Sequence, residues 1–218
     1  MVIINKMRSI IIGAGTYGEV YLAYLQEAEV NIVGFVDDNP NHKGKKIRGV
    51  PVIGNTSELA RIKEEFQIEA VYCPIGNNKT RVRFLSEARA IGYKTPNFIH
   101  PSVIIHKSVQ LGEGVYILLG TKIMPYTVID DYVMISMNAL IAHHNHLQQG
   151  TFVSTGVNFG ASITARKNTY IGIGATIMTG IHELGENCLV GAGAVVIKDV
   201  PDNAVVAGVP AKVIKLKE

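Results

Sequence analysis

Residues 120–147 read GTKIMPYTVIDDYVMISMNALIAHHNHL and place a large apolar residue at every sixth position. The series extends beyond this stretch in both directions, and eleven of its thirteen members are Ile, Leu or Val. They are Ile105, Leu111, Ile117, Ile123, Ile129, Ile135, Ile141, Leu147, Val153, Phe159, Ala165, Ile171 and Ile177. Because a helix repeats every 3.6 residues and a strand every two, a period of six indicates the hexapeptide-repeat coils of a β-helix.

A second register, two residues before the first, favours small or β-branched side chains. Its first members are Val103, Val109, Val115, Thr121, Thr127, Val133 and Ala139. We expect the large residue to point into the coil and the small one to fit at a corner, where a following glycine gives turn freedom. The period breaks once, because seven residues separate Ile177 from Leu184. This predicts one inserted residue, as a bulge or short loop, near residues 180–184.

The first hundred residues alternate between strand-like and helix-like segments. The expected strands are residues 9–12, 30–38, 50–54 and 68–76. The expected helices are residues 19–26, residues 57–66 with a start at Ser57, and residues 79–92 with an end at Gly92. Such alternation predicts a parallel sheet covered by helices.

The totals for the 218 residues narrow the class of protein. The formal charge is only +3 and the lysines are spread out, so no basic tract favours nucleic-acid binding. Cys73 and Cys188 fit no metal-binding spacing, and we expect reduced, buried thiols of a cytosolic protein. The N-terminal apolar run leads into a glycine-rich turn, and no stretch approaches the roughly 20 apolar residues of a membrane span. These features favour a soluble, intracellular protein.

Several motifs together resemble the sugar N- and O-acetyltransferases of the left-handed β-helix superfamily. They are IIGAGTYGEV (11–20), GFVDDNP (34–40), GVPVIG (49–54), IGNN (75–78), the hexads, the histidine after ALIA, and VGAGAVVIKDVPDNAVVAGVPAKVI (190–214). In particular, the chain resembles bacterial nucleotide-linked 4-amino-sugar N-acetyltransferases and the related sialic acid O-acetyltransferases. The likeness implies a Rossmann-like nucleotide-sugar-binding domain over residues 1–98 and a left-handed parallel β-helix over residues 99–218. It also implies a homotrimer with active sites between subunits, and acetyl-CoA in the groove between adjacent β-helices.

The motif GAGTYG follows a strand and opens a helix, so its backbone N–H groups can meet a phosphate. Two acids lie some twenty residues further on, where a dinucleotide fold binds a ribose hydroxyl. The α/β region is too short for a complete dinucleotide fold, and the glycines alone would also suit a close strand–helix turn. The resemblance assigns the nucleotide part of the sugar donor to Gly13, Ala14, Gly15, Asp37 and Asp38. Gly76, Asn77 and Asn78 end a neighbouring strand and are expected in the same crevice.

The histidines at 143, 144 and 146 allow three interpretations. A solvated polar corner is the plain one, and we favour it for His146. A metal site is disfavoured because adjacent His143 and His144 cannot both point at one ion without strain and no carboxylate or cysteine joins them. General-base catalysis suits a side chain whose usual pKa of roughly 6.5 lies near working pH. The resemblance places the family's catalytic histidine at His143, with His144 beside it, and no metal.

Three positions depart from the family pattern. An acid usually follows the catalytic histidine, and here His144 does. A histidine common nine positions on is Phe152, and the polar residue seven positions before the base, often Asn, is Ser136. An imidazole at residue 144 can orient the base but stabilises charge less than a carboxylate does.

The β-helix also supplies candidates for CoA. A backbone N–H near Ala161 or Ile173 is expected to stabilise the thioester oxyanion. Gly191 and Ala192 lie where a ligand can approach the coil closely, and Lys198, Lys212 and Lys215 are candidates for the CoA phosphates. We therefore expect an acetyl-CoA-dependent N-acetyltransferase acting on a nucleotide-linked 4-amino sugar for surface glycan synthesis. O-acetylation of a sialic acid or related sugar, and a non-catalytic trimeric sugar-nucleotide-binding protein, are the alternatives.

Overall fold

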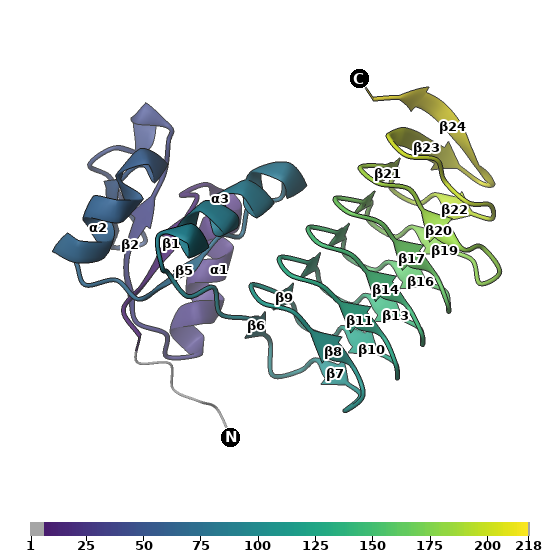
Figure 1. The fold of residues 1–218 in the computed structure, drawn as a ribbon, viewed down its shortest axis with the longest axis horizontal. Coiled ribbons are helices and arrows are strands. Elements are labelled where there is room, and N and C mark those ends of the chain that lie inside the picture. The colour runs from purple at the N-terminus through teal and green to yellow at the C-terminus, as the bar shows by residue number, and fades with distance from the viewer. Residues whose placement is uncertain (1–6, 218) are drawn as a thin grey trace. The chain divides into compact units, whose positions relative to one another are not determined.

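The computed structural model describes residues 7–217, which form two compact units (Figure 1). The first unit ends at Pro96 and the second begins at Asn97. The first unit has the alternating pattern of strands and helices, and the second has the hexad pattern. Each unit has its own hydrogen-bonded sheets.

The first unit is a five-stranded sheet with helices, in the order β3-β4-β2-β1-β5. Its strands are β1 Ser9–Ile12, β2 Ile32–Val36, β3 Lys46–Ile47, β4 Val50–Gly54 and β5 Ala70–Tyr72. Its helices are α1 Thr16–Glu27, α2 Leu59–Glu65 and α3 Asn78–Ala90, with single turns of 3-10 helix at η1 Pro40–His42 and η2 Thr56–Glu58. All strand pairs except β3–β4 are parallel, which confirms the predicted α/β sheet.

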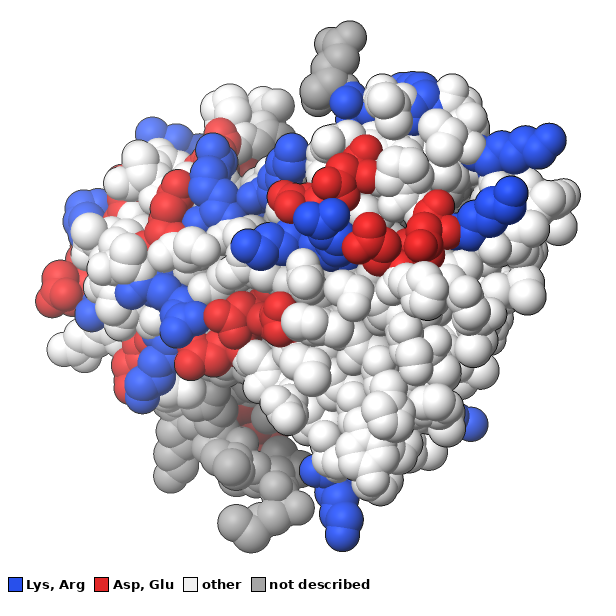
Figure 2. Space-filling model, turned by 45° about the vertical axis from the view of Figure 1, so that its right-hand side comes forward, with Lys and Arg blue, Asp and Glu red and all other residues white. Residues whose placement is uncertain are grey.

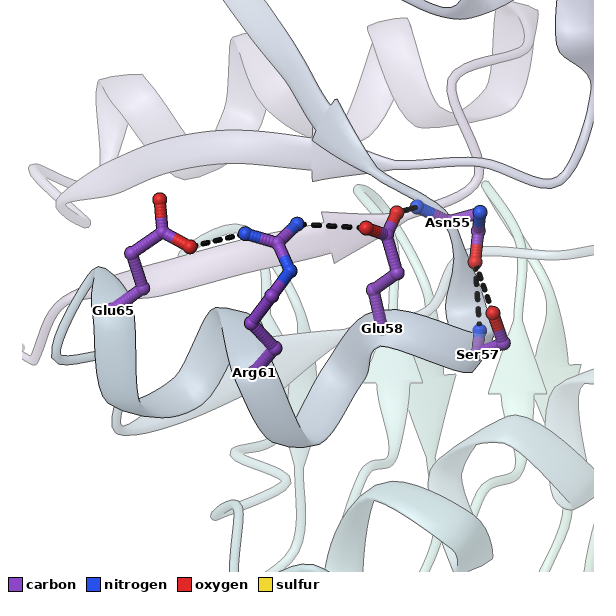
Figure 3. Close-up of polar contacts among 5 residues, drawn as sticks. All are labelled: Asn55, Ser57, Glu58, Arg61 and Glu65. Atoms are coloured by element: carbon purple, nitrogen blue, oxygen red, sulfur yellow. Dashed lines mark hydrogen bonds and ion pairs between the residues drawn. The ribbon is translucent and has the colours of Figure 1, made fainter.

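The helical segment that leads into α2 begins at Thr56, one residue before the predicted start at Ser57, and Asn55 caps this segment. Asn55 is the N-cap: its side-chain oxygen accepts hydrogen bonds from the Ser57 backbone N–H at 3.0 Å and from the Ser57 hydroxyl at 2.6 Å (Figure 3). Glu58 completes a capping box by accepting the Asn55 backbone N–H at 3.0 Å. Arg61 then links Glu58 to Glu65 along the exposed side of the helix. The Asn55 N–H, followed by Arg61, lowers the pKa of the Glu58 carboxyl.

The second unit is a parallel β-helix, as the period of six predicts, and it is left-handed, as the family resemblance implies. Its strands stack into three faces and are two residues long, except for the longer β23 and β24 at the C-terminal end. Face I contains β6 Phe98–Ile99, β9 Tyr116–Ile117, β12 Met134–Ile135, β15 Phe152–Val153, β18 Tyr170–Ile171, β21 Leu189–Val190, β23 Ala204–Gly208 and β24 Ala211–Leu216. Face II contains β7 Ile104–Ile105, β10 Lys122–Ile123, β13 Leu140–Ile141, β16 Asn158–Phe159, β19 Thr176–Ile177 and β22 Val195–Val196. Face III contains β8 Gln110–Leu111, β11 Val128–Ile129, β14 His146–Leu147, β17 Thr164–Ala165 and β20 Glu183–Leu184.

The hexad residues form the second residue of each of these short strands; from Ile117 onward they belong to one buried cluster, against which the half-buried Ile105 and Leu111 pack. The corner register is buried too, and its polar members satisfy their hydrogen bonds along the coil. Thr121, for example, donates its hydroxyl to the Ser136 carbonyl at 2.8 Å. Asn145 donates to the carbonyls of Ala142 and Gly160 and accepts the backbone N–H of Ile163. The Asn145 side chain therefore holds neighbouring coils together.

The predicted insertion lies in the corner between β19 and β20. Thr179 and Ile181 form a bridge across it, and Gly180 has a φ of 103°, which a glycine adopts without strain. This corner joins faces II and III, and we call it the widened corner. The N-terminal end of the β-helix also differs slightly from the prediction, because Phe98–Ile99 already pairs with Tyr116–Ile117.

Figure 2 shows one face on which basic and acidic side chains alternate in a band beside a broad area without charged residues. Such interleaved charges do not make the contiguous basic patch of a nucleic-acid-binding surface. Across the described residues, no helix has the length and hydropathy of a membrane span.

Candidate active site

The residues predicted to hold the nucleotide lie at the carboxyl ends of three neighbouring strands, β2, β1 and β5. Gly13, Ala14 and Gly15 form the turn after β1, the two acids follow β2, and Gly76 follows β5. The chain runs from β1 to β2 and β4 on one side and returns to β5 on the other. Parallel sheets bind ligands at such a reversal of strand order, outside the carboxyl ends. The structure therefore brings these turns to one edge, which we call the sheet-edge crevice.

Asp37 and Asp38 also hold the rim of this crevice together. Asp37 accepts the Ala14 N–H at 2.6 Å through Oδ2 and the Asn39 N–H at 2.7 Å through Oδ1. Asp38 accepts both the backbone N–H and the hydroxyl of Thr56 at 2.8 Å. Because a carboxylate has about four acceptor sites, both acids keep capacity for a ligand. The sequence identifies these residues but not this bracing role.

The glycines of the first turn differ in what surrounds them. A Cβ at Gly15 or Gly76 would meet no heavy atom within 4 Å, whereas a Cβ at Gly18 would lie 1.9 Å from the Gly13 carbonyl oxygen. Gly18 thus lets α1 pack closely on the turn. No side chain caps the N-terminus of α1, so its first N–H groups lack a side-chain acceptor. These N–H groups and the positive end of the helix dipole suit a phosphate.

Asn77 and Asn78 have different partners. Asn77 caps α3 by accepting the Thr80 N–H at 3.0 Å. Asn78 is buried, and its oxygen accepts Nη2 of Arg81 at 3.0 Å, while Nη1 of Arg81 donates to the Ile75 carbonyl at 2.7 Å. Asn78 therefore supports the turn after β5 from inside. Arg81 is fully buried, which no sequence pattern indicates because arginine is mostly exposed.

His143 and His144 lie in the corner that joins β13 on face II to β14 on face III. Both side chains are exposed, and their Nδ1 atoms are 2.9 Å apart with the rings perpendicular. His144 has a φ of 56° and donates its backbone N–H to the Pro125 carbonyl, and its ring lies 4.8 Å from that of Tyr126. Since Nδ1 of His143 faces His144, its Nε2 has no partner among the described residues and can accept a proton.

A groove of about 460 Å³ runs along face II beside this corner. Its walls are largely apolar and include Met124, Leu140, Ala142, Gly160, Met178 and Thr179. The small residues Ala142 and Gly160 leave room between the two exposed methionines. The groove therefore suits an extended, weakly polar chain that ends near the histidines.

The residues predicted to contact CoA border face II on both sides. Ala161 and Lys198 lie at the II–III corner, in the column of His143. Gly191 and Ala192 lie at the I–II corner, as does Ile173. Lys212 and Lys215 belong to the C-terminal strand β24, which pairs with β23 on face I.

The two oxyanion candidates are consequently not equivalent. Ala161 is one coil above His143, at a spacing of about 4.8 Å, and the Ser162 N–H donates to the His143 carbonyl at 3.0 Å. The Ala161 N–H itself donates to the Thr179 hydroxyl oxygen at 3.1 Å. Ile173, by contrast, is at a different corner from His143 within one chain. Thr179 was not singled out from the sequence, although the broken period marks its position.

Two departures from the family pattern have packing roles. Ser136 is buried at the I–II corner, with its hydroxyl 3.0 Å from that of Thr155. Phe152 is buried on face I and stacks on Tyr170, with ring centroids 5.1 Å apart. Neither residue lies at the II–III corner with His143.

His146 is a strand residue on face III, where its Nε2 lies 2.9 Å from Asp130 Oδ1. The predicted solvated corner is therefore replaced by a strand position at which the imidazole contacts a carboxylate. Among the described residues, no three His, Cys, Asp or Glu side chains come together in a group that suits a metal ion.

The cysteines are not nucleophiles of this site. Burial raises the pKa of the Cys73 thiol to about 12 and that of Cys188 to about 11, so both stay protonated near neutral pH. The sequence prediction of reduced, buried thiols is confirmed.

Known proteins resemble both units of this chain. Residues 8–88 match the family described as the PglD N-terminal domain. A His-to-Asn mutant of perosamine N-acetyltransferase from Caulobacter crescentus, solved with CoA and GDP-perosamine, is 30% identical, with a TM-score of 0.89 over 95% of this chain and 97% of that one. The acetyltransferase domain of PglB from Neisseria gonorrhoeae FA1090 is 28% identical, with a TM-score of 0.84 over 96% and 100% of the two chains.

Curated relatives match mainly one half of the chain. A serine acetyltransferase from Buchnera aphidicola is 41% identical over 114 residues, which are 52% of this chain and 41% of that protein. The galactoside O-acetyltransferase of Escherichia coli K12 is 34% identical over 110 residues, which are 50% and 54% of the two chains. The chain spans about half the length of these curated relatives.

Proposed function

The chain belongs to the nucleotide-sugar acetyltransferases of the hexapeptide-repeat family of acyltransferases, and on that premise we propose that it transfers an acetyl group from acetyl-CoA to the 4-amino group of a nucleotide-linked deoxyamino sugar. The observation that carries this proposal is the exposed His143–His144 pair at the end of the face II groove. It offers a free Nε2 where a thioester and an amine would meet. We assign the reaction to surface glycan biosynthesis.

The sheet-edge crevice is proposed to bind the nucleotide part of the sugar. The uncapped N-terminus of α1 and the open backbone at Gly15 and Gly76 would receive the phosphates. Asp37 and Asp38, which brace the rim, would accept hydrogen bonds from the nucleoside. GDP-perosamine in the Caulobacter crescentus relative supports a ligand of this chemistry.

Face II is proposed to bind acetyl-CoA. The acetyl coenzyme A complex of the PglB acetyltransferase domain supports this co-substrate. The apolar groove would hold the pantetheine chain, with backbone approach at Gly191 and Ala192 on one border. Lys198, Lys212 and Lys215 would face the phosphates.

In the proposed mechanism, the amine nitrogen bonds to the thioester carbonyl carbon and the carbonyl electron pair moves to oxygen. Nε2 of His143 accepts the amine proton, while Nδ1–H of His143 donates to Nδ1 of His144. Hydrogen-bond donors beside the corner stabilise the oxyanion. The C–S bond then breaks, and the thiolate receives the proton held by His143.

O-acetylation of a sialic acid or related sugar is a second candidate. It is favoured by the similarity to the galactoside O-acetyltransferase over half of the chain. The same Nε2 would then accept a hydroxyl proton, so the histidine geometry serves both reactions.

We further propose a homotrimer in the cytoplasm, with each active site between two subunits. Exposed apolar side chains on face II and its corners support self-association; they include Ile104, Leu140, Met124 and Met178. Two free, buried thiols fit a reducing compartment.

The experiment that tests the function is a panel of acceptors with acetyl-CoA, monitored by thiol release and mass spectrometry. The panel contains UDP-, dTDP- and GDP-linked 4-amino-4,6-dideoxyhexoses together with sialic acids. An alkali-stable acetamide on one nucleotide sugar is the expected product. An alkali-labile ester on a sialic acid would instead establish the second candidate, and absence of turnover over the whole panel would contradict both.

A further inference from the structure

The widened corner places a threonine hydroxyl over the coil that follows His143. The Ser162 N–H donates to the His143 carbonyl at 3.0 Å, and the adjacent Ala161 N–H donates to Thr179 Oγ1 at 3.1 Å. Three successive coils of the II–III corner are thus joined, from His143 through Ala161 to Thr179. Thr179 is exposed and lines the face II groove together with Ala142.

The insertion is what makes this position different from the rest of the column. Four residues separate β13 from β14, and five separate β19 from β20. Asp199 fixes the far end of the widened corner by accepting the backbone N–H groups of His182 at 2.6 Å and Glu183 at 3.1 Å. Thr179 therefore lies between the coil of Ala161, whose N–H it accepts, and the end of the widened corner that the Asp199 carboxylate holds.

Other hydroxyls cap corner N–H groups in this β-helix, but their hydrogens are already engaged. Ser102 accepts the Gly120 N–H at 3.0 Å and lies 2.8 Å from Nδ1 of His100. Ser108 and His106 repeat the arrangement one hexad later.

Thr179 has no corresponding acceptor for its hydroxyl hydrogen among residues 7–217. Its oxygen accepts an N–H, and this polarises the O–H bond and strengthens it as a donor. The hydroxyl therefore offers the groove an unused hydrogen-bond donor.

We propose that the Thr179 hydroxyl donates a hydrogen bond to the acyl oxygen of the bound thioester, and that Ala161 acts through it. The inference rests on the proposed function, since it needs a thioester in the groove. When the acceptor nitrogen bonds to the acyl carbon, the carbonyl electron pair moves to this oxygen, where Thr179 O–H stabilises it. The pair returns as the C–S bond breaks. Thr179 keeps its hydrogen throughout, and His143 holds the proton.

The test compares Thr179→Val, which keeps the shape and removes the hydroxyl, with Thr179→Ser, which keeps the hydroxyl. Thr164→Val, on the outer side of face III, is the matched control for a threonine-to-valine change. We expect kcat to fall about 10- to 100-fold in Thr179→Val. The KM for acetyl-CoA should change less than threefold, and Thr179→Ser and Thr164→Val should stay within about threefold of the wild type. Thermal unfolding and acetyl-CoA titration calorimetry would show that Thr179→Val still folds and binds.

Two outcomes of these measurements would overturn the role proposed for the Thr179 hydroxyl. If Thr179 serves only as the acceptor of the Ala161 N–H, Thr179→Val frees that donor and kcat stays equal or rises, which overturns the proposal. Equal loss in Thr179→Ser and Thr179→Val would overturn it as well, because the hydroxyl would not be the cause. A wild-type protein without turnover on any acceptor would instead refute the proposed function.

Discussion

The Nδ1 atoms of His143 and His144 lie 2.9 Å apart, so one ring carries the shared hydrogen and the other accepts it. With the hydrogen on His143, its Nε2 is unprotonated and available to a substrate. His144 is held for this task by its left-handed backbone and by the Tyr126 ring. A carboxylate could not share a hydrogen in this reciprocal way, but it would stabilise the imidazolium more strongly.

Variants of His144 therefore distinguish its effect on the orientation of the His143 ring from its effect on the positive charge that this ring acquires. In His144→Gly, which adopts a positive φ without strain and has no side-chain acceptor, we expect kcat to fall about tenfold because the partner that orients the His143 ring is lost. His144→Glu should keep at least wild-type kcat, since it restores an acceptor and adds charge. Steady-state kinetics with both variants measures this. A Gly variant as fast as the wild type would leave His144 without a role.

The glycines of the sheet-edge crevice provide a second contrast between single residues. Gly18→Ala would drive a Cβ into the Gly13 carbonyl, and we expect a loss of about 1–3 kcal/mol in the free energy of unfolding of the first unit. Gly15→Ala meets open space, so its stability should be near that of the wild type. Its new methyl group should nevertheless weaken nucleotide-sugar binding. Calorimetric unfolding and ligand titration of the two variants would contradict this account if both behaved alike.

Among the elements, the widened corner depends on the carboxylate of Asp199. The backbone N–H groups of His182 and Glu183 lower the pKa of this carboxyl. Because its pKa is lower in the folded state than in the unfolded state, the ionised form stabilises the fold above roughly pH 4. That contribution is lost as the pH falls through the folded-state pKa.

Asp199→Ala should lower the free energy of unfolding at pH 7 by less than about 1 kcal/mol, because solvent screens this exposed carboxylate, and the difference from the wild type should shrink in more acidic solution. Asp199→Asn keeps an acceptor oxygen and should lose less. Urea unfolding at pH 7 and near pH 3.5 provides the comparison. A difference that grows toward acid pH would contradict the assigned direction.

The elements also show what sequence patterns can predict. The strict period of six fixed the short strands and the location of the insertion, because each hexad residue must be buried in every coil. The helical segment begins at Thr56, one residue before the predicted start at Ser57, because Asn55 and Glu58 form a capping box around a 3-10 turn that leads into α2 at Leu59. Ile173 and Ala161 looked alike in the sequence, and only the coil geometry assigned them to different corners. The Ala161–Thr179 bond spans 18 residues, and no local pattern encodes it.

For the whole molecule, the predicted homotrimer has a direct measurement. Sedimentation equilibrium should give three times the chain mass of 23.6 kDa. The exposed apolar residues of face II would then be covered by a neighbouring subunit or by CoA. A stable monomer that is fully active would contradict the proposal of active sites between subunits.

The measurement that tests the central claim most directly is thiol release from acetyl-CoA by the wild type and by His143→Ala, with the preferred nucleotide-linked 4-amino sugar. We predict that kcat falls about 10²- to 10⁴-fold in the variant while acetyl-CoA still binds with its wild-type affinity. Unchanged turnover in His143→Ala would contradict the assignment of His143 as the base and, with it, the account of this corner as the active site.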